Sequence, residues 1–305
     1  MSRHNHAGVK RCPSERQEEL YGWLMAAPAL ILLVIFMLVP GLISFGLAFT
    51  DQRLAPGSLP TRFVGLSNFA RLFMDGTFLQ ALKNSVAFTL VVVPLECSLA
   101  LLLALLLNQP LPGVKLFRAI YFSPVAIAMV VAGVIWAMLF NPQGMINGML
   151  NWLSSNQAGE LRWLADTRLA MPAIVIVSIW SSVGFQMMVF LAGLQEITAE
   201  LYDAAAIDGT STWQRFRYVT LPQLRSTMVF VVVTTTILAF RLFTQVEVMT
   251  RGGPQGSTNT VVRYMVETGF RTSRIGYASA VTIVFLVMIV AISLVQRRFI
   301  TVERI

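Results

Sequence analysis

The sequence has few charged side chains for its length. Only 23 Lys and Arg and 15 Asp and Glu occur among 305 residues, whereas 56% of the residues are apolar. Soluble domains usually have about a quarter of their residues charged. The composition therefore excludes an ordinary soluble protein and indicates that lipid is the solvent for most of the chain.

Histidine and cysteine are also scarce. Both histidines, His4 and His6, lie in the polar N-terminus, so no H-E-x-x-H zinc site can form and a membrane-embedded enzyme is not favoured. Cys12 precedes the first apolar segment and Cys97 lies inside the second, so the two are at different depths and are not expected to pair. We predict no catalytic residue and no metal site.

Two further absences concern nucleotides. The sequence contains no G-x-x-x-x-G-K-[ST] loop, so we do not expect the chain to hydrolyse ATP, and we predict no cofactor bound to it. The net charge of +8 is scattered over the loops without a basic run. This argues against a nucleic-acid partner and is typical of positive residues at a membrane surface.

Long apolar segments are what the sequence has in abundance. Each is close to 20 residues, the length of helix that crosses a hydrocarbon core of about 30 Å. None shows the alternation of a barrel strand, and the first is too long for a signal peptide and lacks an A-x-A cleavage site. The predicted fold class is all-α, a polytopic membrane protein with six transmembrane helices over residues 24–49, 85–107, 119–140, 170–194, 227–243 and 277–295.

The chain then divides into three parts. Residues 1–23 form a cytoplasmic N-terminal segment with a short interfacial helix, for which Ser14 and Gln17 have the spacing of a capping box. Residues 24–299 are the transmembrane domain and residues 300–305 a cytoplasmic tail. An even number of spans puts both termini on one side, but basic residues barely indicate which, with 12 of the 23 on the side of the termini.

The polar loops contain two further predicted features. The first loop is too apolar to be a free linker, and we expect an interfacial helix near residues 68–73. Residues 250–254, Thr-Arg-Gly-Gly-Pro, are expected to form an exposed turn because glycine pairs and proline interrupt helices.

Residues 195–226 form the most informative loop. Thr198 can cap a helix, three successive alanines favour it, and Gly209 ends it. Thr210 or Ser211 can cap a second short helix, which Pro222 limits. We predict a helix-turn-helix elbow too polar to enter the bilayer; an ordinary capped surface helix is the plain alternative.

The elbow also carries a spaced motif. It reads Asp203-Ala204-Ala205, three residues, Gly209, nine residues, and Val219-Thr220-Leu221-Pro222. This resembles the EAA signature of ABC importer permeases, with Asp203 and Val219 where glutamate and isoleucine are commonest. Further segments resemble the carbohydrate-uptake branch, with its maltose-type and glycerol-3-phosphate-type permeases: residues 63–69, 140–144 with Asn147, 250–254 and 276–280.

The resemblance implies the type I ABC importer permease (MetI-like) architecture in a bacterial inner (plasma) membrane. It implies a second permease subunit, two copies of a cytoplasmic ABC ATPase that uses ATP and Mg, and an extracytoplasmic solute-binding protein that delivers a sugar or sugar derivative. It places the elbow and both termini in the cytoplasm. The residues that it assigns to ATPase coupling are Asp203, Ala204, Ala205, Asp208, Gly209, Leu221 and Pro222.

Six side chains in or near the spans are candidates for the solute path. Burial of a carboxylate in lipid is costly, an amide or an indole ring suits a sugar, and polar groups at the end of a span suit a cavity wall. Structural pairing, packing of the ring or snorkelling to the interface explains each of them as well. The candidates are Glu96, Trp180, Gln186, Arg241, Gln245 and Glu247.

The alternative function is a secondary transporter or channel for a small polar solute. Such a protein is expected to have charged relay residues in several spans, often with paired interrupted helices. Only Glu96 lies clearly inside a span, so the importer permease is preferred.

Overall fold

The computed structural model describes residues 13–54, 60–110, 112–155 and 159–301. These residues are helical, apart from turns and one isolated antiparallel bridge between Thr50 and Phe63. The all-α prediction is therefore confirmed. Five helices in the described part of the chain are long and apolar enough to cross a membrane, or six if one bent pair counts as a span.

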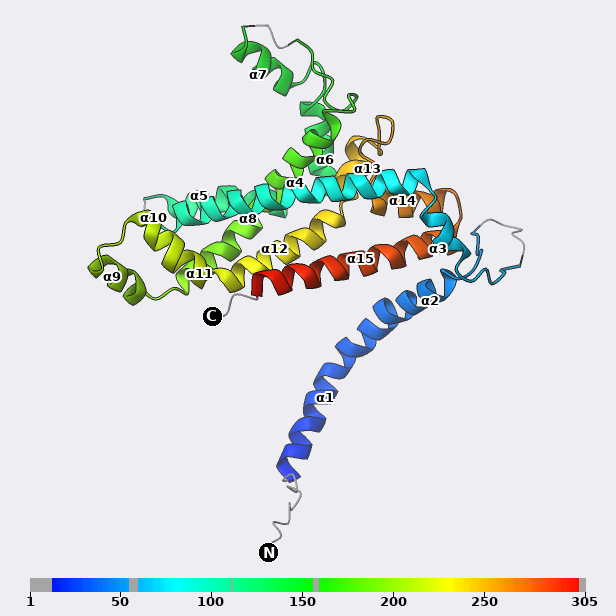
Figure 1. The fold of residues 1–305 in the computed structure, drawn as a ribbon, viewed down its shortest axis with the longest axis horizontal. Coiled ribbons are helices and arrows are strands. Elements are labelled where there is room, and N and C mark those ends of the chain that lie inside the picture. Colours follow the sequence, from blue (N-terminus) through cyan, green and yellow to red (C-terminus); the bar gives the residue numbers. More distant parts are fainter. Residues whose placement is uncertain (1–12, 55–59, 111, 156–158, 302–305) are drawn as a thin grey trace, which may run out of the picture.

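Four long helices form the bundle (Figure 1). They are α4 (Gly76–Leu107), α8 (Ala170–Gln195), α12 (Arg225–Phe240) and α15 (Ile275–Thr301). Fully buried small residues such as Ala100, Ala104 and Ala173 bring these helices close together. Larger side chains, among them Ile174, Phe190 and Phe240, fill three hydrophobic clusters between the helices.

The third predicted span is broken, so a continuous helix over residues 119–140 is wrong. Helix α5 (Val114–Phe122) is followed by a 3-10 turn (Ser123–Ala126), and α6 (Met129–Leu139) then leaves at a bend of 99°. Pro124 lacks an N–H, and Ile127 is extended with ψ 128°. Helix α5 also lies tightly on α8, since a Cβ on Gly184 would lie 2.1 Å from the carbonyl oxygen of Tyr121.

The N-terminal span is a long arm that leaves the bundle (Figure 1). It comprises α1 (Pro13–Leu33), a π-helical turn (Val34–Leu38) and α2 (Val39–Leu47) without interruption. The span therefore covers Gln17–Leu47 rather than 24–49, and no residue in its most apolar window is buried. In the described part the helix is already present at Pro13 and runs into the span, and residues 1–12 and 302–305 lie outside that part, so the interfacial helix within residues 1–23 stays a prediction.

The remaining elements extend the bundle at its ends. The fifth span covers Arg225–Met249, because α13 (Thr244–Met249) continues α12 after a short break. The helix predicted near residues 68–73 is confirmed as α3 (Ser67–Leu72), and its place at the membrane interface stays a prediction. Helices α3, α13 and α14 (Val261–Val266) lie at the end opposite α9 and α10, which we call the far end (Figure 1). Helix α7 (Met145–Leu153) projects beyond α6.

The turn at residues 250–254 is only partly exposed, in contrast to the prediction. Gly252 is buried, and a Cβ there would lie 2.7 Å from the guanidinium of Arg263. That guanidinium forms ion pairs with Glu247 at 3.1 Å and with Glu267 at 2.6 Å. The turn therefore packs onto a network of charges that the local sequence does not reveal.

Candidate functional site

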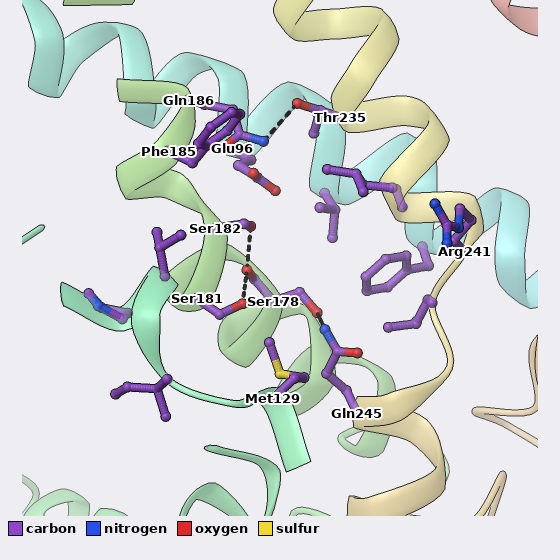
Figure 2. Close-up of a pocket in the computed structure, with 18 residues that line it drawn as sticks. Glu96, Met129, Ser178, Ser181, Ser182, Phe185, Gln186, Thr235, Arg241 and Gln245 are labelled. Atoms are coloured by element: carbon purple, nitrogen blue, oxygen red, sulfur yellow. Dashed lines mark hydrogen bonds between the residues drawn. The ribbon is translucent and has the colours of Figure 1, made fainter. Parts of the chain in front are cut away.

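A cavity of about 380 Å³ lies within the bundle (Figure 2). Its walls come from α4, α8, the broken third span and the junction of α12 with α13. The break in the third span contributes directly, because Pro124, Val125, Ile127 and Met129 line the cavity. A straight helix could not present these four residues together, so the bend helps to create the site.

Two buried polar side chains lie on the cavity wall. Glu96 on α4 and Gln186 on α8 are each only 2% exposed. The Gln186 amide nitrogen donates a hydrogen bond of 3.2 Å to the Thr235 hydroxyl on α12. Within the described residues, however, Oε1 of Glu96 and Oε1 of Gln186 have no hydrogen-bond partner. Unpartnered buried acceptors are costly, so the two together make this wall the candidate functional site.

Three serines of α8 line the cavity between these two acceptors and Gln245 (Figure 2). Ser181 and Ser182 donate to the Ser178 carbonyl at 2.8 and 2.7 Å, and Ser178 donates to the Ile174 carbonyl at 2.8 Å. The Gln245 amide donates to the Ser178 hydroxyl at 3.4 Å. The serine donors are thus used within the protein, and the hydroxyl oxygens add acceptor surface to the cavity.

The cavity unites four of the six candidate solute-path residues, namely Glu96, Gln186, Arg241 and Gln245. Arg241 directly follows α12 and is exposed, so it adds a cation to the part of the cavity wall that lies between α12 and α13. Trp180 lies elsewhere, with its ring edge-on to Trp136 at a centroid distance of 5.4 Å. Glu247 is held in ion pairs with Arg263 and Arg271.

Other residues of the wall were not predicted from the sequence. Ser178, Ser181 and Ser182 recur at helical spacing within an apolar segment, and that signal could have identified them. Phe88, Thr235 and the residues at the break carry no such signal, because their place on the wall depends on how the helices pack.

The elbow has the predicted helix-turn-helix form. Helix α9 (Ala199–Ile207) starts after Thr198, whose side chain forms no capping bond, and Glu200 lies in its first turn. Gly209 has φ +72°, a left-handed conformation that favours glycine. Ser211, rather than Thr210, caps α10 (Thr212–Arg215) and forms a complete capping box with Gln214.

Pro222 does not end the second helix of the elbow, so that part of the prediction is wrong. Helix α10 passes into a π-helical turn (Phe216–Thr220), then α11 (Leu221–Gln223), and almost directly into α12. The wider turn accommodates a proline that has no N–H to donate. Tyr202 on α9 also hydrogen-bonds Thr220 at the end of this turn at 3.0 Å, so the first helix of the elbow is tied to the segment that leads into the fifth span.

Most of the motif residues are accessible. Asp203, Ala204, Asp208, Gly209 and Pro222 are exposed, Leu221 is half-buried, and Ala205 is buried. Three large side chains beside them were not predicted as part of the site although they are far from buried: Ile207 is 87% exposed, Trp213 69% and Tyr218 74%. Large side chains left exposed on such a polar loop are typical of a protein-binding surface.

A lipid-facing helical bundle with a polar intramembrane cavity and an extramembrane elbow defines a membrane transport subunit. The chain belongs to the family described as "Binding-protein-dependent transport system inner membrane component", whose model matches residues 21–301. This membership confirms the permease prediction and decides against the secondary transporter or channel. The family is a transport component rather than an enzyme.

Individual relatives and a solved structure agree. The chain is 36% identical to the lactose transport system permease protein LacF of Rhizobium radiobacter, over 95% of this chain and 97% of that protein. It is 33% identical to the trehalose/maltose transport system permease protein MalF of Thermococcus litoralis, over 92% and 93% respectively. Its fold is similar to a chain of a bacterial ABC transporter involved in the import of alginate, with a TM-score of 0.82, 22% identity and coverage of 96% and 99%.

Proposed function

We propose that this chain is one of two permease subunits that together enclose the path of a sugar or sugar derivative in an ATP-driven importer. The cavity at Glu96 and Gln186 is the observation that carries the proposal. The similar proteins named for lactose and for trehalose/maltose support the class of solute. The solute would reach the cavity from an extracytoplasmic binding protein, as the family description indicates.

The cavity suits a hydroxyl-rich solute. Oε1 of Glu96 and Oε1 of Gln186 lack donors within the described residues, and sugar hydroxyls are donors. Arg241 offers a guanidinium to the ring oxygens or hydroxyls from the other side, and the rings of Phe88 and Phe185 provide apolar surface. A few directed polar groups on an apolar wall are typical of small-molecule sites.

The exposed arm favours a second permease as partner. Residues such as Phe36 and Met37 are 75% and 73% exposed, and the arm leaves the bundle that it precedes. Lipid can cover such a helix, but an arm directed away from its own bundle is also suited to packing on a neighbouring subunit.

Energy comes from a separate ATPase that binds the elbow in the cytoplasm. Two observations support this assignment. The sequence has no phosphate-binding loop, and the elbow exposes the large side chains of Ile207, Trp213 and Tyr218. Two ATPase copies would use ATP and Mg, and both termini would lie on the same side as the elbow. Movement of the elbow would reach the cavity through α12, which carries Thr235 and leads to Arg241.

The solute path is tested in proteoliposomes that contain the assembled importer and its binding protein. We expect Glu96→Gln and Gln186→Ala to raise the KM for uptake of lactose, maltose or trehalose about tenfold, the effect of losing one hydrogen bond of about 1.4 kcal/mol. Thr234→Ala is the matched control, because that hydroxyl bonds to the carbonyls of Phe230 and Val231 away from the cavity wall. Unchanged uptake in both cavity variants would contradict the assignment.

The coupling role of the elbow is tested at Gly209. A side chain there meets no atom within 4 Å, so Gly209→Val strains only the left-handed backbone and leaves the bundle intact. We expect normal membrane insertion, loss of most solute-stimulated ATP hydrolysis, and partial recovery in Gly209→Asn, since asparagine tolerates this conformation. Undiminished solute-stimulated ATP hydrolysis in Gly209→Val would contradict the coupling role of the elbow.

A further inference from the structure

A second, polar pocket of about 210 Å³ lies at the far end of the bundle. It forms where the segment after α2, helix α3, the start of α4 and the start of α15 meet. The residues that line it are Asp51, Gln52, Arg53, Asn68, Arg71, Asp75, Arg274 and Tyr277. None of them belongs to the transport cavity or to the elbow.

Both carboxylates of this pocket are already hydrogen-bonded within the protein. Asp51 accepts a bond of 2.7 Å from the backbone N–H of Arg62. Asp75 accepts bonds from the hydroxyls of Tyr264 and Tyr277 at 2.5 and 2.9 Å, and from two N–H groups of the first turn of α4. A carboxylate has about four acceptor positions, so Asp75 has none to spare for an arginine.

The neutral side chains are committed as well. The Asn68 amide donates at 2.8 Å to the carbonyls of both Ala48 and Thr50, which fixes α3 against the end of α2. Gln52 donates to the Arg53 carbonyl and accepts from Thr61. Asp75 and the two amides are therefore committed within the protein, whereas Asp51 keeps acceptor positions and a negative charge that the three arginines of the pocket outnumber.

Three guanidinium groups remain available. Arg53, Arg71 and Arg274 form no ion pair and no side-chain hydrogen bond with any other residue that the structure describes. They come from three separate segments and line one pocket. Several guanidinium groups that line one pocket without a protein partner are suited to binding a phosphate.

Exposed apolar side chains flank the arginines in the chain. Leu54 follows Arg53 and is 60% exposed, while Phe73 and Met74 follow Arg71 by two and three residues and are 65% and 87% exposed. Phe63 and Leu66 add further exposed apolar surface to the same loop, at 80% and 69%. Arginine at the level of a headgroup and apolar side chains beside it are typical of residues at a membrane surface.

We propose that this pocket, which we call the arginine pocket, binds the phosphate of an anionic phospholipid in the leaflet at the far end. The three arginines hold the phosphodiester, and the apolar side chains of the loop contact the lipid chains. Because α3 and the starts of α4 and α15 all contribute, a bound lipid joins the base of the N-terminal arm to the bundle. The proposal is independent of the transported solute.

The test uses the assembled importer, purified in detergent and depleted of lipid. Binding of dioleoyl phosphatidylglycerol is followed by native mass spectrometry and by the midpoint of thermal unfolding, with dioleoyl phosphatidylcholine and inorganic phosphate as comparisons. We expect phosphatidylglycerol to bind and to raise the midpoint more than either, and the combined change Arg53→Gln, Arg71→Gln and Arg274→Gln to weaken its binding at least about tenfold. The matched control changes three exposed arginines outside the pocket: Arg162→Gln, Arg168→Gln and Arg251→Gln.

Each other outcome overturns the assignment. Equal binding of phosphatidylglycerol by the wild type and the triple variant removes the arginine pocket as the site. An equal effect of inorganic phosphate assigns the pocket to a free anion, and a triple variant that keeps its lipid but loses the binding protein assigns it to a protein contact. If the triple variant does not fold, Arg53→Gln alone serves, because Arg53 is exposed and lies outside any helix.

Discussion

Single residues determine how closely the segments at the far end approach one another. Gly276, near the start of α15, donates its N–H to the Gln52 carbonyl at 3.0 Å. A Cβ on this glycine would lie 2.1 Å from the carbonyl oxygen of Thr50. The contact involves backbone on both sides, so a rotamer change cannot relieve it.

We therefore expect Gly276→Ala to destabilise the protein by about 1–3 kcal/mol, the usual cost of an overpacked contact. The midpoint of thermal unfolding in detergent measures it. Gly46→Ala in α2 is the control, since a Cβ there meets nothing within 4 Å and alanine favours a helix. Equal midpoints for the two variants would show that the segments are not in this contact.

Asp75 gives a prediction with a defined dependence on pH. Burial acts to raise the pKa of this carboxyl, but the bonds from Tyr264, Tyr277 and the N–H groups of Phe78 and Thr77 outweigh it and hold the pKa below its ordinary value of 3.8. The ionised form thus stabilises the folded state at neutral pH, and this contribution is lost as the pH falls through the lowered pKa.

Asp75→Asn is expected to cost about 1–2 kcal/mol at pH 7, reduced from a buried charged bond because the group is partly exposed. The difference from the wild type should shrink only below pH 3.8, where the carboxyl of the unfolded chain binds a proton before that of the folded protein does. Unfolding midpoints of both proteins from pH 7 to pH 3 provide the measurement. A difference that is constant over this range would contradict the role of the ionised carboxyl.

At the scale of the elements, two departures from regular α-helix shape the cavity and the elbow. The third span breaks at Pro124, and the break supplies part of the cavity wall. The elbow passes through a π-helical turn directly before Leu221 and Pro222, so the path from α10 to α12 departs from a regular α-helix. Both departures occur at prolines, but proline alone does not produce them, since Pro94 lies within an uninterrupted α4.

Pro222→Ala restores an N–H at this position and allows the turn to close into a regular α-helix. We expect a rotated elbow and therefore less solute transported per ATP hydrolysed, with normal insertion of the spans. Gln223→Ala, a change at the next exposed residue, is the control. Simultaneous measurement of uptake and ATP hydrolysis in proteoliposomes distinguishes a coupling defect from a loss of protein; an unchanged ratio in Pro222→Ala argues against the π-helical turn as the coupling element.

At the scale of the whole molecule, two surfaces are incomplete in the isolated chain. The N-terminal arm has no buried residue in its most apolar window, and the elbow exposes three large side chains, Ile207, Trp213 and Tyr218. The two lie on different elements, so two different partners can occupy them at the same time.

Photo-crosslinking from benzoylphenylalanine tests these partners. We expect Phe36 on the arm to crosslink to the second permease and Ile207 on the elbow to the ATPase, because each side chain is at least 75% exposed in the isolated chain. Each position is the control for the other. Capture of lipid alone from position 36, or of the permease from position 207, would contradict the corresponding assignment.

The sequence by itself determined the number of apolar segments, the helical class and the elbow. These features depend on local properties: a lipid-facing backbone must satisfy its own hydrogen bonds, and length sets what can span a bilayer. The motif from Asp203 to Pro222 is local as well, and its glycine and its Ser211 cap adopt the conformations that their residue types favour.

Only the tertiary structure decided which polar residues share a site. Glu96, Gln186 and Gln245 are far apart in the chain and meet because α4, α8 and α13 pack around one cavity, while Glu247, two residues from Gln245, turns to Arg263 instead. Likewise the close packing of Tyr121 on Gly184 and the arginine pocket both depend on segments that only folding brings together. Composition and spacing report the local preference of the chain, whereas a site depends on distances between segments that no local preference fixes.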